Sequence, residues 1–247
     1  MDHIDLSSRE YDFNKSSIEP LEIYEDPSGL FSTSSTSKRT LNILELGSGT
    51  GLVGLAIARM LSAAGVIARI VLTDKANVLP LLQRNMEKNH ARGVELEARV
   101  LDWEAVSGIK AKATEKASND SEEAKTSSIE AVSATGTEST AATQPVTTIA
   151  APSTDDLVST EWDLVILSDC IWFPALYAPL TGTLTRLLKP GSTSQLIVAF
   201  EKRNFSEEME FFAALGKSFT FRDVKPEEQD PNYQSDDIFL FLCQRRP

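Results

Sequence analysis

The fold of this chain is decided by one stretch, Leu41-Asn42-Ile43-Leu44-Glu45-Leu46-Gly47-Ser48-Gly49-Thr50-Gly51-Leu52-Val53-Gly54-Leu55. It begins with an apolar run of branched side chains, which is typical of a strand buried on both faces of a parallel sheet. Glycines follow at alternate positions, and the apolar pattern after them predicts a helix over residues 51–63. Strand, glycine turn and helix together are the opening unit of a nucleotide-binding α/β fold.

The spacing of the glycines distinguishes between classes of nucleotide-binding fold. Gly47, Gly49 and Gly51 form G-x-G-x-G, whereas dinucleotide-binding folds use G-x-G-x-x-G, so a nicotinamide-dependent dehydrogenase is disfavoured. Glycine allows close approach of the backbone to a ligand and adopts the positive φ that the turn needs. With Glu45 just before it, the turn resembles motif I of the S-adenosylmethionine methyltransferases, where it passes under the methionine part of the cofactor. The alternative is a tight turn that binds nothing.

Length, charge and cysteine content limit what the chain can be. It has 247 residues and a formal net charge of −12, which suits one α/β domain with an insertion and argues against a basic face for nucleic acid. With two cysteines and two histidines, neither a zinc site nor a disulfide framework is expected, and no metal is needed. No apolar run has the length of a membrane span, and the N-terminus lacks the layout of a signal peptide. We therefore expect no membrane partner and a location in the cytoplasm or the nucleus.

Apolar runs and helical patterns alternate along the rest of the chain. Such alternation predicts a parallel sheet with helices on both faces. The last two strands follow one another without a helix between them, so we expect them to form an antiparallel pair. Strands are predicted at residues 42–46, 69–73, 96–101, 162–169, 195–200, 219–224 and 238–243, and helices at 51–63, 77–89, 175–188 and 206–216.

Polar and aromatic side chains follow several of the predicted strands. In open α/β sheets, ligands bind outside the carboxyl ends of the strands. Asp74 ends the second strand, where a carboxylate can accept both ribose hydroxyls of an adenosyl ligand; otherwise it caps a helix or lies in a loop. Trp103 follows the third strand, where an indole can stack on adenine while Asp102 accepts the adenine amino proton; otherwise they are a core tryptophan and a surface aspartate. Glu45 either orients the turn or meets the cofactor amine.

Asp169-Cys170-Ile171-Trp172, after the fourth strand, makes the resemblance more specific. The chain resembles the seven-strand protein-lysine methyltransferases, which carry a D-x-x-Y motif here, and within them the subfamily that acts on valosin-containing protein, a AAA ATPase. Trp172 stands where the family has tyrosine, and residues 1–40 contain no match to the tryptophan-bearing segment that precedes motif I in the family. Other matching blocks are Leu44 to Gly51, Thr73-Asp74 with Leu82 and Asn85 to Asn89, Tyr233 to Ile238, and Glu201 with Arg203 after the fifth strand.

The resemblance implies a fold, an activity and a site. The fold is α/β, a seven-strand Rossmann-like class I methyltransferase sheet with an antiparallel C-terminal strand pair. The activity is S-adenosylmethionine-dependent N-methylation of a lysine in a protein, such as a AAA ATPase or another abundant cytosolic protein. Asp169 and Trp172 are the expected catalytic residues; otherwise Trp172 is a core residue and Asp169 caps the following helix. The residues expected to bind S-adenosyl-L-methionine are Glu45, Gly47, Ser48, Gly49, Gly51, Asp74, Asp102, Trp103 and Ser168.

The methyltransferase domain is expected to span residues 41–247, after a poorly defined N-terminal segment over 1–40. Residues 108–160 are rich in Ser, Thr and Ala and contain no aromatic side chain, which predicts a disordered insertion. Two alternatives to the main hypothesis stay open. One is a small-molecule N-methyltransferase on the same fold, and the other is a catalytically inactive methyltransferase-like binding protein.

Overall fold

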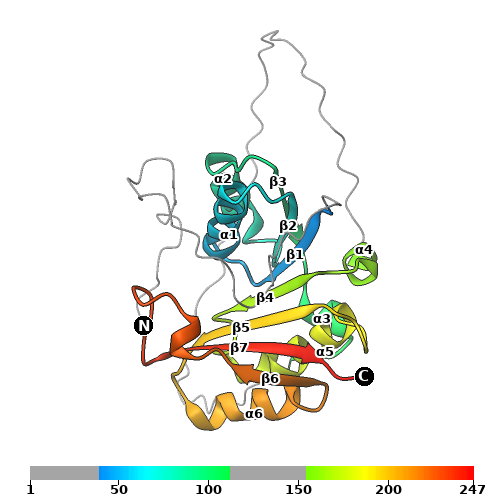
Figure 1. Ribbon diagram of the computed structural model, residues 1–247. Helices are drawn as coiled ribbons and strands as arrows, with labels where there is room; N and C mark the ends of the chain where they lie inside the picture. The colour runs from blue at the N-terminus through cyan, green and yellow to red at the C-terminus, as the bar shows by residue number, and fades with distance from the viewer. Residues whose placement is uncertain (1–38, 112–153) are drawn as a thin grey trace, which may run out of the picture.

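The structure, a computed structural model, describes residues 39–111 and 154–247. Its strands are β1 (Leu41–Leu46), β2 (Ala68–Asp74), β3 (Val94–Val100), β4 (Leu164–Ser168), β5 (Gln195–Glu201), β6 (Phe219–Asp223) and β7 (Ile238–Arg245). They form one seven-stranded sheet in the order β3-β2-β1-β4-β5-β7-β6 (Figure 1). The first five strands are parallel, and β7 runs antiparallel to both of its neighbours. The predicted α/β class and the antiparallel C-terminal pair are confirmed.

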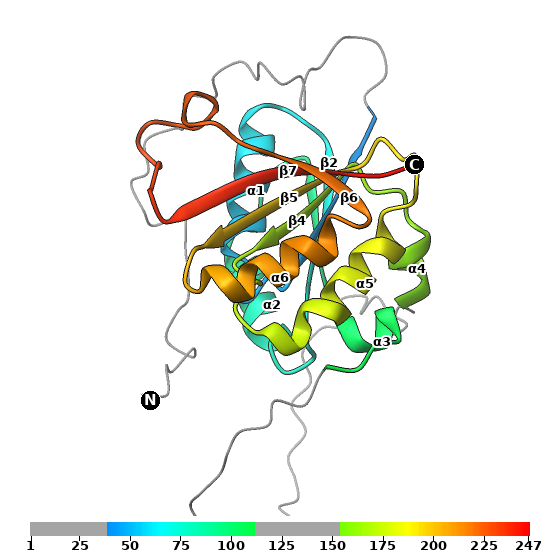
Figure 2. The same cartoon turned by 90° about the horizontal axis from the view of Figure 1, so that it is seen from below.

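Helices cover both faces of the sheet (Figure 2). They are α1 (Leu52–Ala63), α2 (Leu79–Lys88), α3 (Trp103–Ser107), α4 (Thr154–Ser159), α5 (Tyr177–Leu187) and α6 (Phe205–Leu215), with short 3-10 turns η2 (Pro174–Leu176) and η3 (Pro226–Glu228). Because side chains alternate along a strand, Ile43 of β1 enters a core with α1 and α2, whereas Leu44 enters a second core with α3 to α6. Among the described helices, none is long and apolar enough to cross a membrane.

The predicted insertion at 108–160 is corrected at its C-terminal end. Residues Thr154–Ser159 form α4, and Leu157 within it is only 1% exposed. The indole of Trp162 donates a hydrogen bond to the Leu157 carbonyl at 2.9 Å, which fixes this helix just before β4. A helix of six residues gives too short an apolar pattern to stand out in a Ser/Thr-rich segment. Residues 112–153 of the expected insertion, and 1–38 of the expected N-terminal segment, lie outside the described residues.

Candidate active site

The three glycines after β1 all adopt positive φ, but for different reasons. A Cβ at Gly47 would lie 2.7 Å from the sulfur of Cys170 and 3.2 Å from the Trp103 ring, so this position is closed by packing. A Cβ at Gly51 would lie 2.6 Å from a core leucine. At Gly49 nothing lies within 4 Å of the Cβ position. The turn is therefore packed at both ends and open in the middle, where its backbone can approach a ligand.

Two residues connect the open part of the turn with β2: Asp74, which ends β2, and Ser48, which lies in the turn. The Oδ2 atom of Asp74 accepts the Gly49 N–H at 2.8 Å, and its Oδ1 accepts the Lys75 N–H at 2.7 Å. Ser48 is buried between the strands, where its N–H donates to the Thr73 carbonyl at 2.9 Å and its hydroxyl accepts the Thr73 N–H at 3.0 Å. Ser48 thus ties the turn to β2, and Asp74 lies at the rim beside Gly49.

Glu45 is buried beneath the turn rather than open to it. It is 2% exposed, and its Oε2 accepts the Gly54 N–H at 3.2 Å. The N-cap of helix α1 is Gly51, which has no side chain to accept a hydrogen bond. Glu45 instead satisfies one of the unpaired amides at the helix start. Burial raises the pKa of Glu45 to about 7, opposed by hydrogen bonds from Ser48 and Gly54. Of the two roles expected for Glu45, its position favours orienting the turn.

Asp102 and Trp103 lie at the start of α3. The Oδ1 atom of Asp102 accepts the N–H groups of Glu104 and Ala105 at 2.8 and 3.2 Å, so Asp102 is the N-cap of this helix. Asp102 therefore has a capping role that was not predicted from the sequence. Trp103 is partly buried against the core, with its ring beside Gly47. Asp102 therefore stabilises the start of α3, whereas Trp103 faces the glycine turn.

Beyond β4 the chain turns sharply at Asp169. Ser168 ends β4 opposite Ala199 of β5, and the Asp169 N–H donates to the Ala199 carbonyl at 2.8 Å. Asp169 is the one described residue other than glycine with positive φ, at 53°. The turn directs the Cys170 thiol inward, 3.4 Å from the Leu46 carbonyl, and leaves the Asp169 carboxylate half exposed. Cys170 is only 6% exposed, and burial raises the pKa of its thiol, so we interpret it as a packed side chain.

Arg203 is the partner of Asp169. Its guanidinium donates to both carboxylate oxygens at 2.6 and 2.9 Å, and also to Glu201 Oε2 at 2.6 Å. Glu201 and Arg203 were expected after the fifth strand, but their contact with Asp169 was not predicted from the sequence. The signal available in the sequence was that both strands end at the same edge of a parallel sheet.

Trp172 is not a core residue. Its side chain is 62% exposed, and its ring lies 5.5 Å from that of Phe173 at a tilt of 33°. The alternative interpretation of Trp172 as core is therefore wrong. Asp169 is also not a helix cap, because it pairs with Arg203 while η2 and α5 begin without side-chain caps. Both residues lie at the surface, beyond the end of β4.

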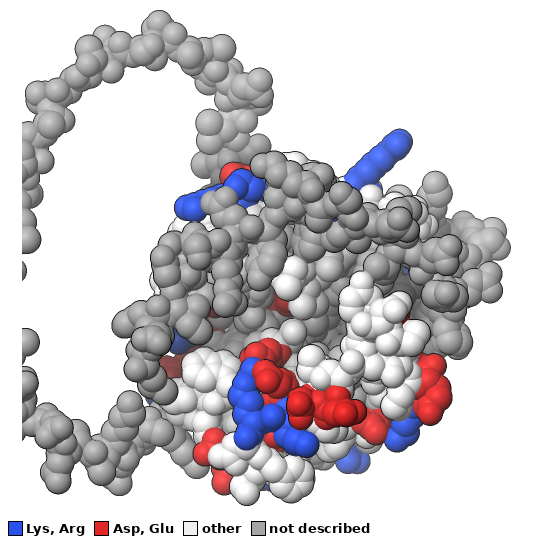
Figure 3. Space-filling view, turned by 90° about the vertical axis from the view of Figure 1, so that its left-hand side faces the viewer, with Lys and Arg blue, Asp and Glu red and all other residues white. Residues whose placement is uncertain are grey.

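Figure 3 faces the side of the molecule on which β4 and β5 end. Lys and Arg side chains lie there next to Asp and Glu side chains in a mixed-charge patch, with uncharged residues around it. Glu201 ends β5, and Glu201, Lys202 and Arg203 are all exposed. Side chains of both charge signs are therefore exposed at this edge of the sheet.

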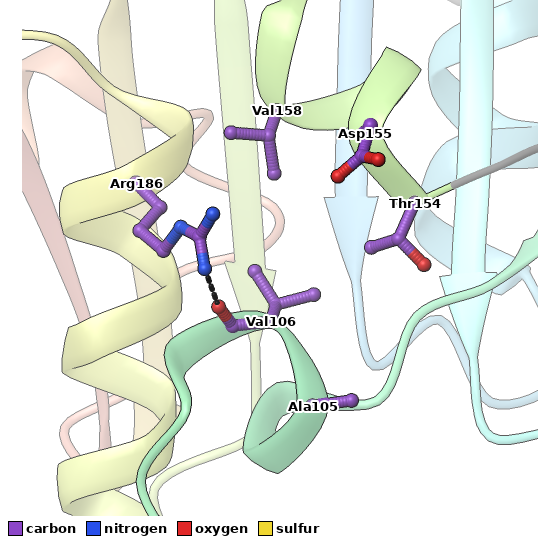
Figure 4. A pocket seen from close by; sticks show the side chains of 6 residues that line it. All are labelled: Ala105, Val106, Thr154, Asp155, Val158 and Arg186. Carbon is purple, nitrogen blue, oxygen red and sulfur yellow. Dashed lines mark hydrogen bonds between the residues drawn. The ribbon is translucent and has the colours of Figure 1, made fainter.

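A small cavity lies elsewhere, between α3, α4 and α5 (Figure 4). Its volume is about 90 Å³, whereas pockets that hold nucleotide-sized ligands have roughly 300 Å³ or more. The Arg186 guanidinium donates to the Val106 carbonyl at 2.6 Å across its wall. None of the predicted site residues lines it. The lining residues are Ala105, Val106, Thr154, Asp155, Val158 and Arg186.

Known proteins resemble this chain in sequence and in fold. A family model described as lysine methyltransferase matches residues 20–120 and 118–218. The chain is 22% identical over 218 residues to the protein-lysine N-methyltransferase EFM6 of Saccharomyces cerevisiae, a similarity that covers 88% of this chain and 72% of EFM6.

Two solved methyltransferase structures are similar at low sequence identity. The CurJ carbon methyltransferase matches with a TM-score of 0.49 and 14% identity over 87% of this chain, which spans 50% of the CurJ chain. The precorrin-6y C5,15-methyltransferase of Geobacter metallireducens GS-15 matches with a TM-score of 0.41 and 14% identity over 89% of this chain and 85% of its own.

The family model covers well over half of the sequence. The matched ranges include the glycine turn, Asp74 at the end of β2, and Asp169 with its partner Arg203. This chain belongs to the lysine methyltransferase family.

Proposed function

We propose that the edge where β1, β2 and β4 end binds S-adenosyl-L-methionine and transfers its methyl group to the side-chain amine of a lysine in a protein substrate. One observation carries the proposal. A glycine turn that is open at Gly49 shares a sheet edge with Asp169, whose carboxylate is held at the surface by Arg203. Membership of the lysine methyltransferase family supports the reaction type.

The residues around the turn fit an adenosyl cofactor. The open Cβ position at Gly49 leaves the backbone accessible to a ligand. A carboxylate has about four lone-pair sites, and Asp74 uses one on each oxygen for a backbone amide, so both oxygens remain able to accept ribose hydroxyls. Trp103 would stack on the adenine, and Ser168 would contact the cofactor from the end of β4. The cofactor's sulfonium supplies an electrophilic methyl group when bound.

Asp169 and Trp172 are the residues that we place beside the substrate amine. The carboxylate of Asp169 would orient the amine towards the cofactor, since a misplacement of about 1 Å can lower a rate on the order of a hundredfold. Trp172 and Phe173 would form one wall of the lysine channel. Once the substrate covers this wall and excludes water, desolvation would disfavour the charged ammonium and so favour the neutral amine, which is the form that attacks. Trp172 provides this wall without the phenol oxygen of the family's tyrosine.

A protein is a better substrate for this edge than a metabolite. Asp169 and Trp172 are 52% and 62% exposed, which suits a lysine on a protein surface better than a small molecule enclosed in a cavity. Within that class we propose a AAA ATPase of the cytoplasm or the nucleus. The support is the match of Asp169 to Ile171 and of Tyr233 to Ile238 with the subfamily that acts on valosin-containing protein.

A transfer assay with labelled cofactor tests this function. The purified chain is incubated with a cell lysate, with a purified AAA ATPase, and with the small-molecule fraction of the same lysate. Label on a lysine of a protein, located by mass spectrometry, is the expected result. Label confined to the small-molecule fraction would instead support a small-molecule N-methyltransferase. Cofactor binding without any transfer would support an inactive binding protein.

A further inference from the structure

Arg203 is held at the end of β5 by three carboxylates. Its guanidinium makes two hydrogen bonds to Asp169, at 2.6 and 2.9 Å, and one to Glu201, at 2.6 Å. Its backbone N–H donates to the Oε1 atom of Glu208 at 2.6 Å, and Glu208 is buried at the start of α6. Both the backbone and the side chain of Arg203 are therefore fixed. Its two terminal nitrogens each donate to one oxygen of the Asp169 carboxylate.

Stability alone does not explain this arrangement. The Arg203 and Asp169 side chains are 41% and 52% exposed, and at such exposure even a bidentate ion pair makes only a modest contribution to folding. Asp169 also adopts a φ of 53°, in the left-handed region that most residues other than glycine avoid and that Asp tolerates better than most. A bidentate pair adds geometric definition as well as energy. What the pair does achieve is to fix the direction of one carboxylate at the sheet edge.

A lysine amine beside a bare carboxylate meets an electrostatic conflict. A nearby negative charge favours the protonated ammonium, but only the neutral amine can attack a methyl carbon. Asp169 and Glu201 together carry two negative charges, and the guanidinium of Arg203 offsets one of them. Hydrogen bonding to Asp169 raises the pKa of Arg203, so the guanidinium stays charged over the whole working range.

Charged groups reach this point from several elements. Negative groups outnumber positive ones there, so the loss of one positive charge leaves the edge strongly acidic. The negative groups around Arg203 are Asp169 after β4, Glu201 at the end of β5 and Glu208 in α6. Glu45 and Asp74 lie on the side of Cys170. The neighbouring positive group is Lys202, whose Nζ lies 5.5 Å over the Phe239 ring.

We propose that Arg203 is a positioning residue for methyl transfer, which aims the Asp169 carboxylate at the substrate amine and offsets the charge that would keep this amine protonated. The inference rests on the function proposed above, in which Asp169 receives the lysine. It assigns to Arg203 an effect on the reacting group through Asp169, without contact between Arg203 and the methyl group.

The test compares Arg203→Gln, Arg203→Lys and a matched control, Arg222→Gln. Arg222 lies on the outer strand β6 and forms the same kind of bidentate pair, with Glu228, at 2.8 and 3.0 Å. Its side chain is 51% exposed, so the control removes a similar surface pair at another place in the sheet. Single-turnover methyl transfer to a lysine-bearing substrate is measured as a function of pH, with the melting temperature and the cofactor dissociation constant of each protein.

We expect the pH midpoint of transfer to rise by about one unit in Arg203→Gln, with a rate about tenfold lower below the midpoint. The melting temperature and cofactor affinity of Arg203→Gln should match those of Arg222→Gln. The control Arg222→Gln should itself keep the pH midpoint of the wild type. Arg203→Lys should restore the midpoint, because it restores the charge. Its maximal rate should stay below that of the wild type, because an ammonium cannot make two parallel hydrogen bonds to one carboxylate.

Three results would overturn the assignment, and they show whether the proposed function falls with it. If the wild type methylates lysine and Arg203→Gln keeps both its midpoint and its maximal rate, Arg203 has no positioning role and the proposed function stands. The same conclusion follows if Arg203→Gln only lowers the melting temperature. If the wild type transfers no label to any lysine, the proposed function and the role of Arg203 fall together.

Discussion

Glu45→Gln probes the buried carboxylate beneath the glycine turn. Glu45 is almost fully buried and accepts the Gly54 N–H at 3.2 Å. Burial raises its pKa from 4.5 to about 7; hydrogen bonds from Ser48 and Gly54 oppose this rise, and the charge of Asp74 adds to it. Glutamine keeps an oxygen acceptor for the Gly54 amide but cannot ionise. The substitution therefore removes the charge and preserves the support of helix α1.

The expected magnitude follows from the difference in proton binding between the folded and unfolded states. Because the folded protein holds the Glu45 proton more tightly, the stabilising effect is complete below pH 4.5 and is lost as the pH rises to about 7. Each pH unit in this interval lowers the free energy of unfolding by about 1.4 kcal/mol, so the wild type loses about 3 kcal/mol through Glu45. Glutamine does not titrate, so the variant avoids this loss.

Urea unfolding at about pH 4.5 and about pH 8, followed by tryptophan fluorescence, measures the effect. Relative to the wild type, Glu45→Gln is expected to gain about 3 kcal/mol in free energy of unfolding between the two conditions. Cofactor affinity, measured as a control, should change little if Glu45 orients the turn. The reasoning is refuted if the stability difference between the two proteins is the same at both pH values.

Asp74→Asn keeps an acceptor for the Gly49 amide but loses the charge, so cofactor binding should weaken about tenfold or more in calorimetric titration; an unchanged dissociation constant would remove Asp74 from the site. Asp169→Ala should retain cofactor binding and lose roughly a hundredfold in single-turnover transfer, and full activity in the folded variant would exclude its catalytic role. Trp172→Tyr restores the family residue and should keep or raise the transfer rate, whereas Trp172→Ala should lower it without lowering the melting temperature; a rate unaffected by alanine would contradict the aromatic wall. Leu157→Ala should lower the free energy of unfolding by about 2–5 kcal/mol in urea titration, and a negligible loss would show that α4 does not belong to the core.

The sequence by itself determined the α/β order of elements and the edge that carries the site. The apolar run of β1, the glycine turn and the apolar pattern of α1 are local signals, so they can be interpreted without knowing the contacts made by the rest of the chain. Because parallel strands present their carboxyl ends at one edge, Asp74 and Asp169 could be assigned to a common edge from strand order alone. In the structure Asp74 is the last residue of β2, and Asp169 directly follows β4.

Only the tertiary structure decided what each of these side chains contacts. Asp169 and Arg203 are 34 residues apart in sequence, and they meet because β4 and β5 pair with Ser168 opposite Ala199. Glu45 accepts a helix amide, and Asp102 caps α3, because the packed turn and helix bring those amides to them. Local periodicity encodes which face a residue takes, but partners depend on strand register and burial. Register and burial arise from packing across the whole sheet, which no short stretch of sequence contains.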